Sequence, residues 1–280
     1  MKLAALGPEG TYSSQAAREY DPEAELVLAS TIPEAIAMVA SGDCRRGLIP
    51  LENSIEGTVR PSFDGLFDHG LFVHDEHEME ISHTLWGTET SVTSDDVMEV
   101  HSHEQALGQC REYLDRNYPK AVRVPSASTA AAIKRVAKSD RSYIVAIGPD
   151  FAGRKHGLSK IDEAIEDQPN NITQFVAFSK QPKARKPLGF TLVALIPEKN
   201  RPGLLRDIAT VIEPKDAAED RGDIDMSRFE ARPSRTKLGE YIFYARLEMP
   251  SDDPRFETLV DELADMEDGG VLLHRMTAES

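Results

Sequence analysis

Short apolar runs alternate with helical patterns along the first part of the chain. Residues 2–6, 25–29 and 47–50 are apolar runs of strand length. The first run is followed by a turn at residues 7–10 and a helical pattern from about residue 13 to residue 20. Thr31 can cap the next helix, which carries Ile36 and Val39 on one face and ends at Gly42. This alternation of strand and helix predicts parallel strands joined by right-handed crossovers.

A second α/β unit begins near residue 81. Ser102 is the expected cap of a helix that runs to residue 117 and carries Leu107, Cys110 and Leu114 on its inward face. Residues 122–124 and 142–147 are predicted strands, with an alanine-rich helix over residues 130–137 between them. Residues 170–178 alternate like a strand that returns to the first unit. Two lobes connected in this way predict a cleft between them.

The pattern changes after residues 181–188, which are basic, contain two prolines and form the expected linker. Predicted strands over 190–196, 224–231, 238–247 and 271–276, with helices over 203–212 and 254–266, have the order βαββαβ of a ferredoxin-like domain. We therefore expect an α/β protein. Residues 1–180 form a two-lobed domain, with lobe one at about 1–80 and 168–180 and lobe two at about 81–167, and residues 189–276 form the ferredoxin-like domain.

The charge balance is strongly acidic, with 32 Lys and Arg against 48 Asp and Glu and a formal charge of −16. Nucleic acid and anionic membranes would repel such a chain, so we expect neither as a partner. No apolar stretch reaches the roughly 20 residues of a membrane span, and the N-terminal apolar run is too short for a signal peptide. We therefore expect a cytoplasmic protein. Its 20 Arg, 12 Lys and many carboxylates favour a salt-adapted source, where salt screens self-repulsion.

The cysteines and histidines do not predict a metal site. Two cysteines, at positions 44 and 110, cannot form a disulfide framework or a thiolate cluster, and we expect Cys110 to be a buried reduced thiol. His74 and His77, and likewise His101 and His103, are spaced like metal ligands but lack the flanking pattern of a metal helix, so we expect them on solvated surface. Nucleophile-elbow, Walker and dinucleotide-binding motifs do not occur.

Hydroxyl and amide side chains follow the predicted strands. They are Thr11 and Ser13 after the first strand, Asn53 and Ser54 after the third, Ser128 and Thr129 in the second unit, and Thr173 in the returning strand. Helix capping alone explains those at each of the three turns, but not Thr173. Together they predict a site for a small polycarboxylate, because helix N-termini at the carboxyl ends of parallel strands attract anions. Glu52, beside Asn53, is the carboxylate that we retain as a candidate general acid.

Six motifs occur in register along the chain. They are Gly7-Pro8-x-Gly10-Thr11-Tyr12-Ser13, Pro50-x-Glu52-Asn53-Ser54-x-x-Gly57, Ser128-Thr129-Ala130-x-Ala132, Asn171-x-Thr173-x-Phe175, Arg201-Pro202-Gly203-Leu204-Leu205 and Ser227-Arg228-Phe229-Glu230-Ala231-Arg232-Pro233. With these motifs, residues 2–180 resemble prephenate dehydratase, and the remainder resembles the regulatory ACT domain attached to that enzyme. The resemblance implies a two-lobed catalytic domain like the type II periplasmic binding proteins.

The resemblance also implies a reaction, the conversion of prephenate to phenylpyruvate with loss of water and carbon dioxide in phenylalanine biosynthesis. Because the gain of aromaticity drives this reaction, we expect no metal and no other cofactor. Thr173 matches the family's catalytic threonine, and we expect its hydroxyl to polarise the leaving hydroxyl while water or Glu52 shares the proton. The expected substrate-binding residues are Thr11, Ser13, Asn53, Ser54, Ser128, Thr129, Asn171, Gln174 and Phe175.

The C-terminal motifs imply feedback by L-phenylalanine in a homodimer or homotetramer that forms through the ACT domain. The implied effector-binding residues are Gly203, Leu204, Leu205, Glu230, Arg232 and Pro233. Leu204 and Ala231 replace a usual alanine and a usual serine. Whether phenylalanine inhibits therefore stays open.

Gln174 departs from the family's Thr-Arg-Phe motif. Glutamine offers neutral amide donors where arginine offers a full positive charge. Either another cation or the helix N-termini replace that charge, or the arginine has mainly a structural role. Gln174 is also the feature that favours a non-catalytic two-lobed ligand sensor. Arogenate dehydratase is the closest enzymatic alternative, since arogenate has an amino group in place of the keto group, and Thr173 disfavours a non-aromatising prephenate decarboxylase.

Overall fold

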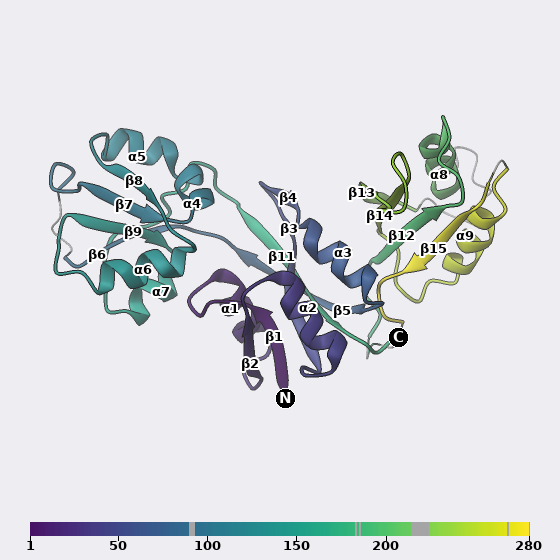
Figure 1. Ribbon diagram of the computed structural model, residues 1–280, viewed down its shortest axis with the longest axis horizontal. Helices are drawn as coiled ribbons and strands as arrows, with labels where there is room; N and C mark the ends of the chain where they lie inside the picture. The colour runs from purple at the N-terminus through teal and green to yellow at the C-terminus, as the bar shows by residue number, and fades with distance from the viewer. Residues whose placement is uncertain (90–92, 183, 185, 214–223, 268, 280) are drawn as a thin grey trace. The chain divides into compact units, whose positions relative to one another are not determined.

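The computed structural model describes residues 1–89, 93–182, 184, 186–213, 224–267 and 269–279. The chain divides into two compact units, Met1–Ser62 with Glu76–Val176, and Phe63–Asp75 with Ala177–Ser280. The described strands form three sheets, with helices between them along the chain (Figure 1). This is the α/β fold class that the sequence predicts.

The first sheet has the strand order β2-β1-β3-β11-β5, with β4 paired to β3. Strand β1 pairs in parallel with β2 and with β3, as predicted. The returning strand β11 lies beside β3, which confirms that residues 170–178 lead back to the first unit. The elements are β1 (Lys2–Leu6), α1 (Tyr12–Tyr20), β2 (Glu25–Ala29), α2 (Ile32–Ser41), β3 (Arg46–Asn53), β4 (Gly57–Thr58), α3 (Arg60–Asp68), β5 (Phe72–Glu80) and β11 (Ile172–Ser179).

Local signals set the ends of the first helices correctly. Thr31 caps α2 by accepting a hydrogen bond from the Glu34 N–H, and Gly42 ends the helix with a φ of 94°. The predicted end of the third strand at residue 50 is wrong, because β3 continues to Asn53. Strand β4 pairs with Glu52 and Asn53, so the extra residues of β3 gain backbone partners.

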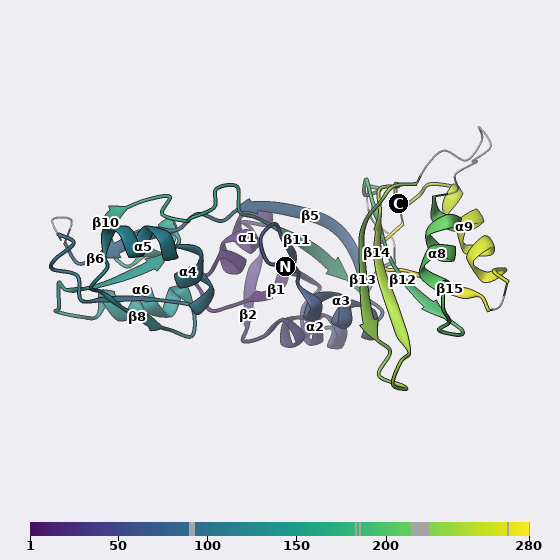
Figure 2. The ribbon, with the colours of Figure 1, turned by 90° about the horizontal axis from the view of Figure 1, so that it is seen from above.

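The second sheet has the order β10-β6-β9-β7-β8 and helices on both faces (Figures 1 and 2). Alternate residues of β9 face opposite sides, as expected for a strand. Val145 and Ile147 pack with Leu107 and Leu114, whereas Ala146 packs with α6 and α7. The elements are β6 (Thr84–Gly87), β7 (Glu99–Ser102), α4 (Glu104–Gln109), α5 (Arg111–Asn117), β8 (Val122–Pro125), α6 (Thr129–Ala137), β9 (Ile144–Gly148), α7 (Asp150–Lys155) and β10 (Ser159–Asp162).

The helix predicted after Ser102 differs in two respects. Ser102 is the last residue of β7 and its hydroxyl donates to the Ile147 carbonyl over 2.7 Å, so His103 occupies the cap position. The helix is also divided into α4 and α5 at Cys110, whose φ and ψ of −112° and 20° are not helical. The Cys110 side chain is fully buried, as predicted, and burial raises the pKa of its thiol.

The third sheet has the order β13-β14-β12-β15, and each pair of neighbouring strands in it is antiparallel. With the chain order βαββαβ, this confirms the predicted ferredoxin-like topology. Helices α8 and α9 bury Ile208 and Leu259 against Val193 and Phe243 of the sheet. The elements are β12 (Thr191–Pro197), α8 (Leu204–Ile212), β13 (Met226–Pro233), β14 (Tyr241–Leu247), α9 (Arg255–Ala264) and β15 (Val271–Arg275).

Helix length also bears on membranes. Among the described residues, no helix is both long enough and apolar enough to cross a bilayer.

Candidate active site

A cavity of about 1100 Å³ lies within the first unit, at the ends of strands from both of its sheets. Thr11 and Ser13 reach it from the start of α1, and Ser128 and Thr129 from the start of α6. The third strand and the returning strand contribute the remaining predicted lining residues, which are Asn53, Asn171, Thr173 and Phe175. Segments more than 100 residues apart in the sequence therefore meet around one space.

Thr173 is held in the cavity wall by the side-chain amide of Asn53. The Asn53 Nδ2 donates to the Thr173 Oγ1 over 2.9 Å and to the Asn171 Oδ1 over 2.6 Å. Both partners of Asn53 are buried, and so is Asn53. Because the Thr173 oxygen accepts this bond, its own hydrogen remains available to donate into the cavity. Hydrogen bonds in such a chain also strengthen one another, which makes the hydroxyl a better donor.

The orientation of the Asn53 amide is set by the turn that follows β3. Its Oδ1 accepts from the N–H groups of Ile55 and Glu56, both over 3.0 Å, so its NH₂ must face Thr173. This corrects the prediction that Asn53 and Ser54 open a helix. A side-chain carbonyl that takes two N–H groups forms an Asx-type turn, and the next helix, α3, starts only at Arg60.

The predicted helix-start residues also act as caps. The Thr11 Oγ1 accepts from the Ser14 N–H over 3.3 Å and donates to the Pro8 carbonyl over 2.9 Å. The Ser128 Oγ accepts from the Ala131 N–H over 3.0 Å. Capping satisfies only part of each first turn, so N–H groups such as those of Ser13 and Thr129 have no intrahelical partner. Two helix N-termini thus face the cavity with their partial positive charge.

Three predicted substrate-binding or catalytic residues lie outside the cavity lining. Glu52 is not among the lining residues, and successive side chains of a strand point to opposite faces while Asn53 reaches inward. Ser54 instead joins two segments: its hydroxyl donates to the Asn170 carbonyl and accepts from the Ile172 N–H. Gln174 donates to the Glu76 carboxylate over 2.7 Å, on the opposite side of β11 from Thr173 and Phe175.

A buried histidine in the lining, His83, was not predicted from the sequence. Its Nε2 lies 2.8 Å from the Gln109 Oε1, an atom that can only accept, so Nε2 carries the hydrogen. Its Nδ1 lies 3.3 Å from the Tyr12 hydroxyl, which donates to the Ser82 carbonyl over 2.5 Å. Burial lowers the pKa of His83, which keeps the ring neutral at pH 7. Gln109 also lines the cavity and was not predicted. Its place next to the buried Cys110 was the only sign in the sequence that it would face inward.

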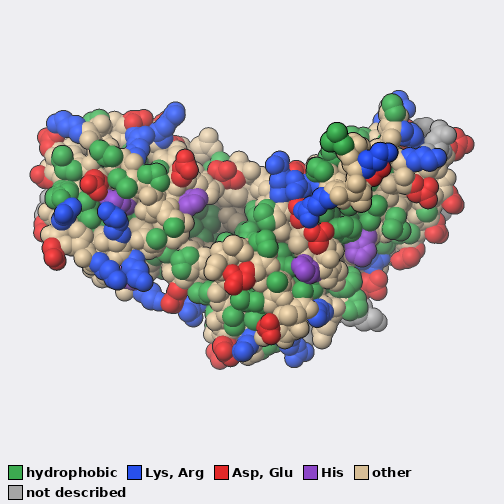
Figure 3. Space-filling view, in the orientation of Figure 1, with side chains coloured by type: hydrophobic (Ala, Val, Ile, Leu, Met, Phe, Trp, Pro, Cys, Tyr) green, Lys and Arg blue, Asp and Glu red, His purple; other side chains and the backbone are tan. Residues whose placement is uncertain are grey.

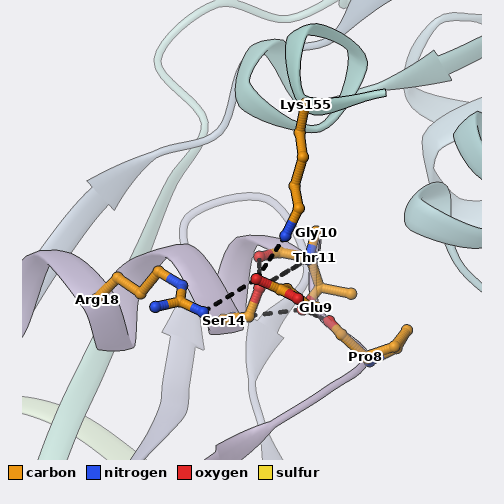
Figure 4. A network of polar contacts seen from close by, with 7 residues as sticks. All are labelled: Pro8, Glu9, Gly10, Thr11, Ser14, Arg18 and Lys155. Atoms are coloured by element: carbon orange, nitrogen blue, oxygen red, sulfur yellow. Dashed lines mark hydrogen bonds and ion pairs between the residues drawn. The ribbon is translucent and has the colours of Figure 1, made fainter. Parts of the chain in front are cut away.

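Charge around the cavity is distributed unevenly. Among the described residues, neither a lysine nor an arginine lines the cavity, whereas the carboxylates Glu9 and Glu56 do. Glu9 is bound by Lys155 Nζ over 2.6 Å and by Arg18 Nη2 over 2.9 Å (Figure 4). On the face in Figure 3 acidic and basic side chains are interspersed.

Comparison with known proteins places the chain in a family. The family profile described as prephenate dehydratase matches residues 3–183. The prephenate dehydratase of Lactococcus lactis subsp. cremoris is 35% identical over 254 residues, covering 89% of this chain and 87% of that one. The chain belongs to the prephenate dehydratase family. Members are lyases, and this is the class of enzyme to which the chain belongs.

Two solved structures extend this membership over the full chain. The prephenate dehydratase of Staphylococcus aureus has a TM-score of 0.84 and 27% identity, and all of both chains is covered. The prephenate dehydratase of Arthrobacter aurescens, described in complex with L-Phe, has a TM-score of 0.81 and 26% identity, covering 97% of this chain and 89% of that one. Both structures are thus similar to this chain over its two-lobed part and over its C-terminal ferredoxin-like part.

The residues predicted to bind the effector lie in different surroundings in the ferredoxin-like domain. Gly203 precedes α8 with a φ of 86°, a conformation that favours glycine, and Leu205 is half exposed. Leu204 is buried in the core of the ferredoxin-like domain, so its bulk fills that core rather than a ligand site. Glu230 and Pro233 lie on β13, and β14 separates that strand from β12, which leads to Gly203.

Arg232 differs from its expected role, because its guanidinium is already paired. Its Nε and Nη2 contact the two carboxylate oxygens of Asp64 on α3, over 3.1 and 2.6 Å. Arg235 adds contacts to Asp64 and Asp68. Phe63 of α3 stacks on Tyr244 in the same region. The motif arginine thus holds β13 to α3 in this structure.

The two members of each histidine pair contact different groups. His74 contacts the Ser179 hydroxyl, and His77 faces Glu19. His101 is fully buried beside Glu99, so its predicted place on solvated surface is wrong, whereas His103 caps α4. His101 belongs to strand β7, whereas His103 follows that strand and begins α4.

Proposed function

We propose that the cavity binds prephenate and releases phenylpyruvate, water and carbon dioxide, as a step of phenylalanine biosynthesis. The observation that carries this proposal is the Thr173 hydroxyl, held by Asn53 in a cavity that two helix N-termini face. Prephenate has two carboxylates and a ring hydroxyl placed to leave as the ring carboxylate departs. A site for it must bind anions and donate a hydrogen bond, and this cavity offers both.

Thr173 is the proposed catalytic residue. A neutral threonine is too weak an acid to protonate the leaving hydroxyl by itself, so its hydroxyl acts by hydrogen bonding. The C–O bond breaks as the bond to the ring carboxylate breaks, carbon dioxide departs and the electron pair enters the new aromatic ring. The hydroxide that leaves takes a proton from solvent. Glu52, which lies outside the lining, is not needed for this step.

The proposed binding residues surround the two carboxylates with neutral donors. The first turns of α1 and α6 present N–H groups beside Ser13, Ser128 and Thr129. Asn171 is held by Asn53 and helps to fix the wall that carries Thr173. Phe175 packs in the same wall and offers an apolar face to the ring. Substrate orientation by such fixed groups supplies much of the rate enhancement.

We further propose that residues 1–180 are the catalytic domain, 181–188 a linker and 189–276 an ACT domain that binds L-phenylalanine. The complex of the Arthrobacter aurescens relative with L-Phe supports this effector. Strand β13 forms an edge of its sheet, and an open edge can meet a second copy of the chain. Because β14 lies between β13 and β12, the strand that leads to Gly203, an effector site shared between two subunits fits the proposal.

A direct assay tests the proposed reaction. Purified protein is incubated with prephenate, and phenylpyruvate is measured by its absorbance in alkali. A parallel incubation with arogenate, followed by detection of phenylalanine, tests the enzymatic alternative. Turnover of prephenate supports the proposal, faster turnover of arogenate favours arogenate dehydratase, and binding of either acid without product would identify a ligand sensor.

A further inference from the structure

An ion-pair cluster at the cavity joins the two sheets of the first unit. Glu9 belongs to the turn between β1 and α1 and lines the cavity, whereas Lys155 belongs to α7 beside the second sheet. Figure 4 shows Lys155 and Arg18 approaching Glu9 from two different helices. Both cations contact the same oxygen, Oε1, over 2.6 and 2.9 Å.

The close contact of the turn with the second sheet's helices supports this arrangement. A Cβ added at Gly10 would lie 3.3 Å from the Ala130 Cβ and 3.8 Å from the Ala152 Cβ. Gly10 also has a φ of 93°, so its backbone conformation favours glycine. The turn is therefore held near α6 and α7, which keeps Glu9 within reach of Lys155. The Lys155 ammonium also lowers the pKa of the Glu9 carboxyl, so Glu9 is ionised at pH 7.

The cluster determines how much charge a bound anion meets. Since neither lysine nor arginine is among the described lining residues, Glu9 without its partners would leave a bare carboxylate facing the ligand. With Lys155 and Arg18, the cluster has a net charge of +1. Prephenate carries two negative charges, whereas arogenate carries two carboxylates and one ammonium, a net charge of −1. A charge added to or removed from the protein therefore changes the binding free energy of prephenate by about twice as much as that of arogenate.

We propose that Lys155 and Arg18 act through Glu9 to set the substrate preference, favouring the doubly negative keto acid prephenate over the singly negative arogenate. This inference rests on the proposed function. Lys155 and Arg18 are positioning and charge-setting residues in this account, since neither lines the cavity.

Four variants test the proposal by changing the net charge of the cluster of Glu9, Lys155 and Arg18 in steps. Glu9→Gln raises the net charge to +2, the wild type has +1, and Lys155→Gln or Arg18→Gln has 0. The double variant Glu9→Gln/Lys155→Gln returns to +1. We expect Lys155→Gln to raise the KM for prephenate by about tenfold and that for arogenate by about threefold, with small changes in kcat. Glu9→Gln should shift the preference toward prephenate, and the double variant should restore the wild-type ratio.

Arg154→Gln is the matched control, because Arg154 is on the same helix and pairs with Asp150. It removes one positive charge next to Lys155 without touching Glu9, and we expect less than a twofold change in the substrate ratio. Lys155→Arg keeps the charge and should retain the wild-type ratio. Raising the salt concentration from 0.1 M to 2 M should shrink the effect of Lys155→Gln.

The outcomes separate this proposal from the function on which it rests. If the wild type turns over neither acid, the proposed function is wrong, and the substrate preference that rests on it is wrong with it. Suppose that the wild type is active but Lys155→Gln changes the ratio of the two KM values no more than Arg154→Gln does. Lys155 then has no special role, and the proposal is wrong. A double variant whose ratio stays at that of Lys155→Gln would also overturn it, since charge would not be the cause.

Discussion

The cavity of the first unit and strand β13 of the second unit both carry family motifs, yet their side chains are used differently. In the cavity, Asn53 and Thr173 are neutral, and the Thr173 oxygen accepts from the Asn53 amide, so its own hydrogen stays available to a further acceptor. On β13, the motif arginine Arg232 is bound through both arms of its guanidinium to Asp64. The first motif thus keeps a neutral hydroxyl at a cavity, while the arginine of the second holds two elements of the protein together.

The physical difference is the cost of leaving a group without a partner. The side chains of Arg232 and Asp64 are only 24% and 15% exposed, so an unpaired charge at either position would be strongly unfavourable. A neutral hydroxyl such as that of Thr173 pays much less for one unmade bond. A motif therefore identifies a residue, but its charge and burial decide whether it is available to a ligand.

The largest expected effect comes from removing the cavity hydroxyl. Thr173→Ala should lower kcat by about 100-fold or more, because the hydrogen bond to the leaving group acts in the transition state. Thr173→Ser keeps a hydroxyl in reach of Asn53 and should retain most of the activity. Steady-state kinetics with prephenate measures both, and near wild-type turnover by Thr173→Ala would end the assignment.

Removing the arginine of β13 should affect stability. Arg232→Gln leaves the mostly buried carboxylate of Asp64 with one positive charge fewer beside it and should lower the free energy of unfolding by about 1–2 kcal/mol. Arg235→Gln is the control, since that side chain is 63% exposed, and its loss should be smaller. Denaturant unfolding compares them. Equal losses in the two variants would show that the pairing of Arg232 is not special.

Acidification should reveal one histidine with a lowered pKa in each region, the buried His83 and the partly buried His274. Burial lowers the pKa of His83 in the cavity and of His274 in the second unit below about 6.5. As the pH falls, the unfolded chain therefore takes up these two protons before the folded chain does. The contribution of the two neutral rings to the free energy of unfolding is complete above about pH 6.5 and is lost as the pH falls through the folded-state pKa values.

The slope is at most about 1.4 kcal/mol per pH unit for each histidine. Unfolding measured from pH 7.5 to 4.5 gives this dependence, and His83→Gln and His274→Gln should each reduce it. A pH dependence unchanged in both variants would contradict the assignment to these rings.

The smallest effect is expected at the departure from the family motif. Gln174 donates to Glu76 outside the cavity lining, so a charge introduced there does not face the substrate directly. Gln174→Arg should change the KM for prephenate by less than about threefold. A large fall in KM would show instead that the motif arginine supplies a charge to the site.

The local sequence was sufficient for the elements with strong periodicity or clear caps. Strands β1 and β2, the caps Thr31 and Gly42, and the order βαββαβ were predicted from apolar spacing and helix-end residues. Two features that depend on contacts with distant segments were not predicted. They are the division of a helix at Cys110 and the turn in which Asn53 takes part. The domain limits, the oligomeric state and the salt-adapted source stay predictions.

Periodicity, helix caps and motifs are properties of neighbouring positions, and they were enough to predict the fold class, the family and most of the polar residues that line the cavity. Which of those residues face inward depends on the packing of distant segments: Glu52, Ser54 and Gln174 do not line the cavity, whereas His83, Gln109 and Glu9 do. The same packing brings Lys155 to Glu9 and Arg232 to Asp64. Such pairings join positions up to 168 residues apart, and their distances depend on the packing of whole elements rather than on any local pattern.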